Sequence, residues 1–432
     1  MLDSTVQPVA APDELAYNYW FLKRCFIHPE RLKDQDLFAS QGDSLAQAGL
    51  TGPTDLTGIN DNEYLSLQAL YQSLQDPYTR YVAPQKAASQ QQHDTSSAYS
   101  GGIGVEYAWA PGPDSIRLEI FRVYPDGPAD SAGLRKGDRL LMSNGVNLQT
   151  DSAYVFIRRL LQDSLWIRLQ VLRASDTLAI DIKRGMVYAP TVFNDTLDGV
   201  PVLLIRQFVR SSIRDGGTNL EFHRALMATQ SAHARVLDLR GNPGGEVQVC
   251  LAMADEFIDH GPMIHLIEHS FDGRGRAVVD TTTPQSTTGG AGVGSYAVLL
   301  VDSLTASCAE IFAVALHDNL GDQAVLVGNH TYGKGIGQSH WKTPAGGMSI
   351  VTSLQIRSPQ WLDYQGIGVA PDIATTPENA LSAAITLVQA QNSLPRRIQT
   401  STTAQFPRIL REVDAPSGPT GGAWQYLPEI TP

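Results

Sequence analysis

The sequence has few cysteines and no long apolar runs. Its 432 residues include three cysteines, Cys25, Cys250 and Cys308, which are too few and too scattered for a zinc site or a disulfide framework, although one pair could form. No apolar run approaches the ~20 residues that a membrane-spanning helix needs. Spacings typical of metal ligands, such as His-Glu-x-x-His, are also missing, so we expect neither a metal nor another cofactor.

Basic residues are scarce relative to acidic ones. The chain has 32 Lys and Arg against 44 Asp and Glu, which gives a formal net charge of −12. Nucleic-acid-binding surfaces are basic, so nucleic acid is not an expected partner. Residues 1–12 have neither the basic nor the apolar segment of a signal peptide. Either the protein is cytoplasmic or a targeting segment has been removed.

A chain of this length exceeds what one hydrophobic core can organise, so several domains are expected. Residues 1–95 predict a helical region, with one helix around residues 17–22 and another that places Leu67, Leu70 and Leu74 on one stripe. Residues 85–100, rich in Gln, Ala and Ser, predict a linker. Alternating apolar residues in segments 116–120, 166–172 and 178–182 predict the strands of a β-rich domain over residues 97–186, which one helix at residues 152–161 interrupts.

The sequence pattern differs in residues 187–395, where short apolar runs alternate with helical patterns. The runs are residues 202–205, 236–239, 298–301 and 325–327, and the helical stretches are residues 219–229, 246–258 and 306–317. Such alternation predicts βαβ units in a layered α/β core. Residues 396–432 are polar and Pro-rich and predict an extension over the surface. The expected fold is therefore a multidomain α/β protein.

Two glycine-containing segments of the β-rich domain suggest peptide binding. The run Gly102-Ile103-Gly104-Val105 precedes the first strand, and its small residues leave backbone N–H groups free to bind a carboxylate, although a plain tight turn fits this run equally well. Residues 127–138, which contain Ala-Gly-Leu followed by a Gly-Asp turn, resemble the signature of PDZ domains. A PDZ domain would bind a polypeptide C-terminus between Gly102–Val105 and the helix at residues 152–161; packing only against neighbouring domains is the alternative.

A serine-containing turn is the first candidate catalytic element. Ser303, Thr305 and Ser307 follow the strand at residues 298–301 and open a helix. A helix N-terminus offers N–H groups and a favourable dipole to developing negative charge. Ser and Thr are also common helix caps, so the turn needs a base elsewhere to indicate catalysis.

That base is Lys334, in the segment Gly333-Lys334-Gly335-Ile336-Gly337-Gln338. Lysine can take a proton from serine when burial or a positive neighbour lowers its pKa, and flanking glycines allow close packing around it. Gln338, four residues on, could hold the amine in place. A surface loop is the simpler interpretation of Gly-Lys-Gly alone.

A strand that runs into a glycine turn, residues 237–245, could supply an oxyanion hole through the N–H groups of Gly244 or Gly245. It lacks the Gly-Lys-Ser/Thr ending of a phosphate loop.

Along the chain, the glycine turn comes first, the serine turn second and the lysine segment third. These three segments, in that order, resemble the C-terminal processing peptidases, also called tail-specific proteases. Residues 76–81 and 368–372 also look like this family, and the resemblance extends from about residue 61 to residue 391. It implies a crotonase-like peptidase core, with Ser307 as nucleophile, Lys334 as general base, Gln338 as its orienting partner and the N–H groups of Cys308 and of Gly244 or Gly245 as the oxyanion hole. Cys308 and Ala309 stand where the family usually has Ala and Ser, and the loop at residues 319–323 is slightly longer.

We therefore expect a serine endopeptidase that cleaves unstructured polypeptides with free C-termini. A gated or inactive PDZ binding scaffold on the same fold is the alternative, and a protease that cleaves one signalling partner is a narrower version of the same chemistry. The resemblance implies an extracytoplasmic location, such as a bacterial periplasm or cell envelope. It also implies a gate that holds Ser307 and Lys334 apart at rest, and a homodimer through the N-terminal helices. His317, His330 and His340 lie near the motifs, but the family pattern gives none of them a catalytic position.

Overall fold

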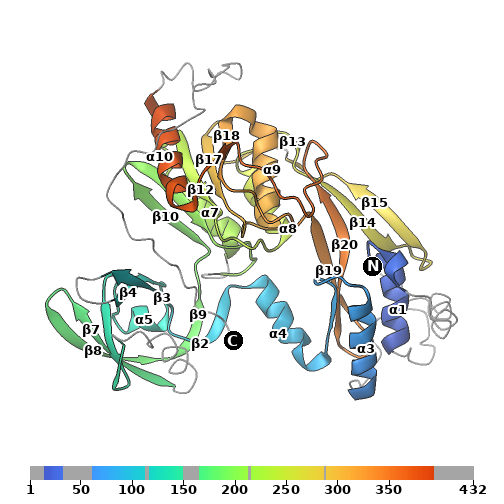
Figure 1. Cartoon of the computed structure of the whole chain (residues 1–432), viewed down its shortest axis with the longest axis horizontal. Helices are drawn as coiled ribbons and strands as arrows, with labels where there is room; N and C mark the ends of the chain where they lie inside the picture. Colours follow the sequence, from blue (N-terminus) through green and yellow to red (C-terminus); the bar gives the residue numbers. More distant parts are fainter. Residues whose placement is uncertain are drawn as a thin grey trace. The chain divides into compact units, whose positions relative to one another are not determined.

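The computed structural model describes residues 14–32, 61–111, 116–148, 165–212, 216–286 and 289–393 (Figure 1). These residues form two compact units. The smaller unit contains residues 96–191 and 209–221, whereas the larger unit contains the N-terminal part up to residue 95 together with residues 192–208 and 222–392. The β-rich segment is therefore inserted into the chain of the larger unit.

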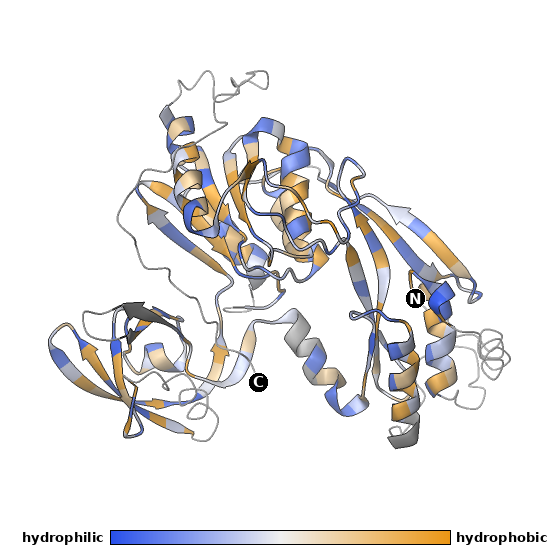
Figure 2. Ribbon diagram, in the orientation of Figure 1, coloured by the Kyte–Doolittle hydropathy of each residue, from blue (hydrophilic) through white to orange (hydrophobic). Residues whose placement is uncertain are grey.

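The smaller unit is built on an antiparallel sheet with the strand order β3-β4-β5-β7-β8. Its strands are β3 (Val105–Pro111), β4 (Ile116–Val123), β5 (Arg139–Ser143), β6 (Val146–Asn147), which pairs with β5, β7 (Trp166–Arg173) and β8 (Asp176–Lys183). The alternation predicted for β7 is confirmed, because Ile167, Leu169 and Val171 are buried and polar residues stand between them (Figure 2). The helix predicted at residues 152–161 lies outside the described residues.

Three shorter elements complete this unit. They are β2 (Ala98–Gly102), β9 (Gly185–Tyr188) and the helix α5 (Pro128–Ser131). β2 and β9 pair with each other in a separate two-stranded sheet.

The larger unit contains a six-stranded sheet with the order β10-β11-β12-β17-β18-β21. Its strands are β10 (Val192–Leu197), β11 (Val200–Ile205), β12 (Ala234–Asp238), β17 (Tyr296–Val301), β18 (Ala324–Gly328) and β21 (Ile373–Ala374). All neighbours from β11 to β21 are parallel, and β10 is antiparallel to β11. The predicted layered α/β core is confirmed.

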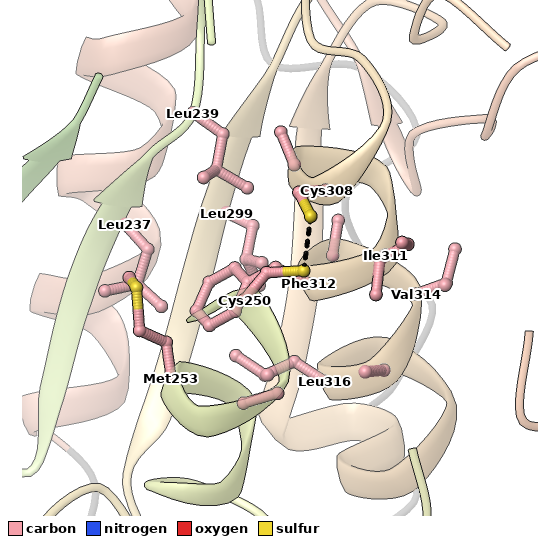
Figure 3. Close-up of a cluster of buried hydrophobic side chains, with 14 of the residues drawn as sticks. Leu237, Leu239, Cys250, Met253, Leu299, Cys308, Ile311, Phe312, Val314 and Leu316 are labelled. Carbon is pink, nitrogen blue, oxygen red and sulfur yellow. Dashed lines mark hydrogen bonds between the residues drawn. The ribbon is translucent and has the colours of Figure 1, made fainter. Parts of the chain in front are cut away.

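Helices cover both faces of this sheet. They are α7 (Gly217–Ala228), α8 (Val247–Asp255), α9 (Cys308–Leu320) and α10 (Pro377–Ser393). Leu237 and Leu299 pack with residues of α8 and α9 in one core cluster (Figure 3). Val236 and Val298, which point to the opposite face, pack with α10 in another cluster. Alternation along each strand therefore supplies apolar side chains to both helical layers.

A second sheet of the larger unit packs against the N-terminal helices. It has the order β1-β20-β14-β15, and β19 pairs with β20. Its strands are β1 (Arg80–Val82), β14 (His265–Phe271), β15 (Ala277–Thr282), β19 (Ile336–Lys342) and β20 (Met348–Arg357). The helices α1 (Glu14–Cys25) and α3 (Asp61–Ser73) share a buried cluster with this sheet, in which the rings of Trp20 and Phe271 are 5.1 Å apart.

The predicted linker at residues 85–100 is wrong. Residues 84–95 form the helix α4 (Pro84–Thr95), and β2 begins at Ala98. Proline fits the first turn of a helix, and Gln, Ala and Lys are good helix formers, so the polar composition of this segment conceals a helix. No helix among the described residues combines the length and hydropathy that crossing a membrane would require.

Candidate active site

The nucleophile candidate Ser307 lies in the turn between β17 and α9. Asp302 shapes this turn, because its Oδ1 accepts hydrogen bonds from the N–H groups of Leu304 and Gly241, each 3.0 Å long. Ser307 itself has φ 56° and ψ −120°, a conformation that non-glycine residues rarely adopt. It is partly exposed, whereas the adjacent Cys308 is buried. The fold therefore stores local backbone strain at the residue that the sequence predicts to react.

A buried carboxylate, that of Glu310, ties the serine turn to the lysine loop. Its Oε2 accepts hydrogen bonds from the backbone N–H groups of Ser307 at 2.9 Å and Lys334 at 2.8 Å. Its Oε1 accepts from the N–H of Gly333 at 2.7 Å and from the Thr331 hydroxyl. The side chain has no exposed surface, so these four donors satisfy a charge that would otherwise be costly to bury.

Lys334 is held in a semi-buried position beside Gln338 and Tyr78. Its Nζ donates a hydrogen bond of 2.9 Å to Gln338 Oε1 and lies 4.5 Å from the centre of the Tyr78 ring. Burial lowers the pKa of Lys334, and the charge of Arg80 lowers it further, whereas Asp76 acts in the opposite direction. Lowering of the pKa is what a lysine base requires.

The glycines around Lys334 are needed for close packing. Gly333 has φ +88°, and a Cβ on it would lie 2.7 Å from the backbone nitrogen of Gly368. A Cβ on Gly335 would lie 3.2 Å from the backbone nitrogen of Gln365. These contacts agree with the expectation that flanking glycines allow the backbone to pack tightly at this site.

No hydrogen bond joins the Ser307 hydroxyl to the Lys334 amine among the described residues. The two segments instead meet through the carboxylate of Glu310. A base that removes the serine proton must reach hydrogen-bond distance of it. The structure therefore brings the two predicted residues into one site without the contact that proton transfer needs.

A chain of hydrogen bonds extends from Lys334 to the N-terminal part of the larger unit. Gln338 Nε2 donates to Thr352 Oγ1 at 3.3 Å, and Thr352 Oγ1 donates to Asp76 Oδ2 at 2.6 Å. Asp76 Oδ2 also accepts from the hydroxyl of Thr79. An ionised carboxylate only accepts hydrogen bonds, so it fixes the direction of every bond in the chain. Gln338 must then turn its carbonyl oxygen towards Lys334.

The glycine turn lies against Ser307, where the predicted oxyanion hole would have to be. A Cβ on Gly244 would be 2.7 Å from Ser307 Cβ and 2.8 Å from the backbone nitrogen of Cys308. The N–H of Gly244 already donates to Asn242 Oδ1 at 2.8 Å. Within the described part of the chain, the N–H groups of Cys308 and Gly245 have no hydrogen-bond acceptor. Of the two predicted glycines, Gly245 therefore has the N–H that is free for an oxyanion.

The predicted carboxylate loop of the smaller unit connects β2 and β3. Its carbonyl groups are engaged, since Ile103 O accepts from the N–H of Ala129 at 2.8 Å and Gly104 O accepts from the N–H of Tyr124 at 2.9 Å. Gly104 has φ +79°, which favours glycine. The N–H groups of Ile103 and Gly104 have no acceptor among the described residues. Gly102 and Val105 lie at the ends of the flanking strands.

Of the three histidines near the motifs, His317 is bound elsewhere. Its ring nitrogens lie 3.4 Å from Asp318 Oδ1 and 3.2 Å from Asp372 Oδ1. His330 and His340 are exposed. Hydrogen bonds with the two aspartates raise the pKa of His317 to about 10, so it is a cation at neutral pH and not a base.

Sequence reasoning missed the supporting residues of this site. The sequence alone assigned no role to Glu310, and it identified residues 76–81 only as similar to the family. Glu310 stands at the third position of its helix, where an acidic residue is a common cap, and this was the available signal. Thr352, within a largely buried strand, carried no signal of its own.

Two family models match the chain. Residues 202–375 match peptidase family S41, and residues 119–170 match the PDZ domain. The first range contains Ser307, Lys334, Gln338 and the glycine turn, and the second lies in the smaller unit.

Named relatives agree with these matches. Carboxyl-terminal-processing peptidase 1, chloroplastic, of Arabidopsis thaliana is 29% identical over 317 residues, which are 71% of this chain and 61% of that protein. The carboxyl-terminal-processing protease of Synechocystis sp. is 28% identical over 324 residues, 72% of this chain and 70% of that protein. The matched region thus spans between three fifths and three quarters of these relatives.

A solved structure shares the fold. The photosystem II D1 C-terminal processing protease superposes with a TM-score of 0.51 at 21% identity, over 86% of this chain and 94% of that one. The chain therefore contains a peptidase family S41 region and a PDZ domain, and curated relatives are named carboxyl-terminal-processing peptidases, in agreement with the resemblance read from the sequence.

Proposed function

We propose that the protein is a serine endopeptidase with Ser307 as nucleophile and Lys334 as general base. The observation that carries this proposal is the Glu310 carboxylate, which binds the backbone of both residues. A binding scaffold needs no buried acid to fix a strained serine next to a partly buried lysine. Membership of a family of processing peptidases supports the same conclusion.

The chemistry is acyl transfer. Neutral Lys334 takes the proton of Ser307 Oγ, and this oxygen attacks the carbonyl carbon of a peptide bond. The N–H groups of Cys308 and of the glycine turn then stabilise the negative oxygen. Lys334 returns the proton to the leaving amine, and water hydrolyses the acyl-enzyme. The missing hydrogen bond between serine and lysine supports a resting state that must tighten when substrate binds.

Gln338 keeps the lysine in its productive orientation. The Asp76–Thr352–Gln338 chain presents an oxygen to the Lys334 amine, so a lysine N–H points to Gln338. The lone pair of the neutral amine is then left for the serine proton. A reversed Gln338 amide would instead offer an N–H and compete for that lone pair.

The substrates that we propose are unstructured polypeptides with free C-termini. Exposed apolar side chains rim the site: 65% of Leu304, 55% of Tyr332 and 72% of Ile367 remain accessible. The loops that carry them are bonded to each other and to the catalytic segments, as in the bond from Tyr332 N–H to Thr305 O. An extended chain could bury its apolar side chains on such a rim, whereas a folded protein hides them. The unpaired N–H groups of Ile103 and Gly104 support capture of a C-terminal carboxylate.

Cleavage of casein tests this proposal. Purified protein is compared with Ser307→Ala and Lys334→Ala, and with the exposed matched controls Ser303→Ala and Lys342→Ala. We expect the two site variants to lose at least ~10³-fold in rate and the controls to keep the wild-type rate. A peptide with a free C-terminus is added in a second series to open a gated form. Absence of cleavage in both series would favour the scaffold, and full activity of Lys334→Ala would exclude the dyad.

Two further proposals concern the cellular location and the oligomeric state of the protein. We propose an extracytoplasmic location, such as a bacterial periplasm or cell envelope, because the resemblance to C-terminal processing peptidases implies it. Fractionation of cells, followed by detection with an antibody, tests this. We also propose a homodimer through the N-terminal helices. Tyr64 and Leu65 of α3 are 36% and 65% exposed, which leaves apolar surface for a second copy. Replacing both with Glu should convert a dimer to a monomer in light scattering.

A further inference from the structure

Two buried thiols lie next to each other behind the nucleophile. The Sγ atoms of Cys250 and Cys308 are 2.7 Å apart, and neither residue has exposed surface (Figure 3). A disulfide has an S–S distance of about 2.05 Å, so a small approach of the two side chains would close the bond. The third cysteine, Cys25, belongs to a different core cluster, with α1 and α3.

The two cysteines lie near the N-terminal ends of two helices. Cys250 lies in the first turn of α8, which starts just after Gly244 and Gly245. Cys308 is the first residue of α9, and its N–H belongs to the proposed oxyanion hole. A covalent link between them would hold together the two helix ends that carry the oxyanion donors.

From this geometry we infer that Cys250 and Cys308 form a disulfide modification site that braces the catalytic turns. The reaction is thiol–disulfide exchange with an oxidised low-molecular-weight disulfide such as oxidised glutathione. The thiolate of one cysteine displaces one glutathione, and the second cysteine displaces the other from the mixed disulfide. The two protein sulfurs are oxidised, and one glutathione disulfide is reduced to two thiols, to which the two cysteine protons pass.

Burial determines when this bond can form. Burial raises the pKa of the Cys250 thiol well above its usual range, and the adjacent Cys308 thiol raises it further. A thiol with so little thiolate is a slow nucleophile, and the oxidant cannot reach it in the closed core. The bond should therefore form while the chain folds in an oxidising medium, and form slowly or not at all in the folded protein. Once made, it should resist reduction for the same reason.

The link should also stabilise the larger unit. It would close a loop between residues 58 positions apart, and long loops gain most from cross-linking. Allowing for strain at the two helix ends, we expect the melting temperature to rise by about 5 °C. That the bond braces the oxyanion hole rests on the proposed function, whereas the bond itself and the melting temperature are measured without any substrate.

Oxidative refolding tests the inference. The full chain is unfolded in urea with dithiothreitol, refolded in buffers that contain either reduced glutathione alone or an excess of oxidised glutathione, alkylated under denaturing conditions, and mapped by mass spectrometry. We expect a cross-linked peptide pair containing Cys250 and Cys308, with Cys25 alkylated, only in the oxidised sample. The melting temperature of that sample should be about 5 °C higher.

Variants separate this outcome from the alternatives. Cys25→Ala should keep both the cross-link and the rise in melting temperature, and Cys250→Ala should lose both. The inference is overturned if Cys250 and Cys308 are alkylated or glutathionylated in the oxidised wild type, or if Cys25 is cross-linked instead. Failure of the casein assay would leave the cross-linked peptide unaffected, so the two proposals fail separately.

Discussion

Replacement of Glu310 by Gln probes the tie between the serine turn and the lysine loop. The amide can keep one oxygen acceptor, which should face the backbone donors of Ser307 and Lys334 because they cannot rotate. Its NH₂ group then takes the place of Oε1 and faces the N–H of Gly333, which loses its partner. The hydroxyl of Thr331 can rotate and accept from the new NH₂ group.

The expected loss in the free energy of unfolding follows from the hydrogen bonds that this replacement removes or weakens. One buried N–H without a partner costs about 1–3 kcal/mol, and two charge-assisted bonds that become neutral lose about 1 kcal/mol each. We expect Glu310→Gln to lower the free energy of unfolding of the larger unit by about 4 kcal/mol. The casein rate should also fall, since the serine and lysine backbones are no longer held by one charge.

Urea unfolding followed by circular dichroism measures this difference. The matched control is Glu256→Gln, a carboxylate of the same unit that accepts hydrogen bonds from the Ala291 N–H and the His223 ring. Its amide can keep the first bond and donate to the ring in the second, so about 1 kcal/mol should be lost. A loss below about 1 kcal/mol in Glu310→Gln would refute the assignment of Glu310 as the tie between the two segments.

Three further predictions test neighbouring features. Asp76→Asn removes a charge that raises the pKa of Lys334, so the acid limb of the pH profile of kcat/KM should move to lower pH. The value of kcat should fall about 10-fold. An acid limb that does not move would contradict the role of the Asp76–Thr352–Gln338 chain. His317→Gln should cost about 1 kcal/mol below pH ~6.5, because the folded pKa of His317 is raised to about 10 and the cationic form is favoured. That difference should disappear as the pH rises through about 10 in urea titrations, and the opposite trend would exclude the ion pairs. Gly244→Ala should abolish casein cleavage, because its Cβ would lie 2.7 Å from Ser307 Cβ. Gly241→Ala is the control for backbone strain, since Gly241 also has a positive φ (+70°) but has open space around it, and it should retain most activity.

The sequence predicted those parts of the candidate site that lie within one short segment of the chain. Lys334 and Gln338 are four residues apart in one glycine-rich segment, and the structure joins their side chains by a hydrogen bond. The serine turn was predicted because a strand end and a helix start are both readable in one short segment. Several strands of the smaller unit were predicted from their alternation, and several strands of the six-stranded sheet from their short apolar runs.

The rest depends on contacts that no local pattern encodes. Glu310 bonds to the lysine loop across 21 to 24 residues, and Asp76 meets Thr352 across 276 residues. Only the packing of β1 against β20 brings these last two together. The helix α4 was missed for another reason, since a polar helix and a polar linker share the same composition.

The distance in sequence between Asp76 and Thr352 has a consequence for the timing of activity. Ribosomes deliver the N-terminal part first, so a growing chain carries Ser307 and then Lys334 before β20 has been synthesised. Until that strand pairs with β19, Gln338 has no Thr352 beside its amide, and until it pairs with β1, Thr352 has no Asp76 to accept its hydroxyl hydrogen. A nascent or prematurely terminated chain thus contains Ser307 but lacks the hydrogen bonds that orient Lys334 in the proposed mechanism. Under the proposed mechanism, completion of the sheet that contains β1, β19 and β20 therefore precedes activity.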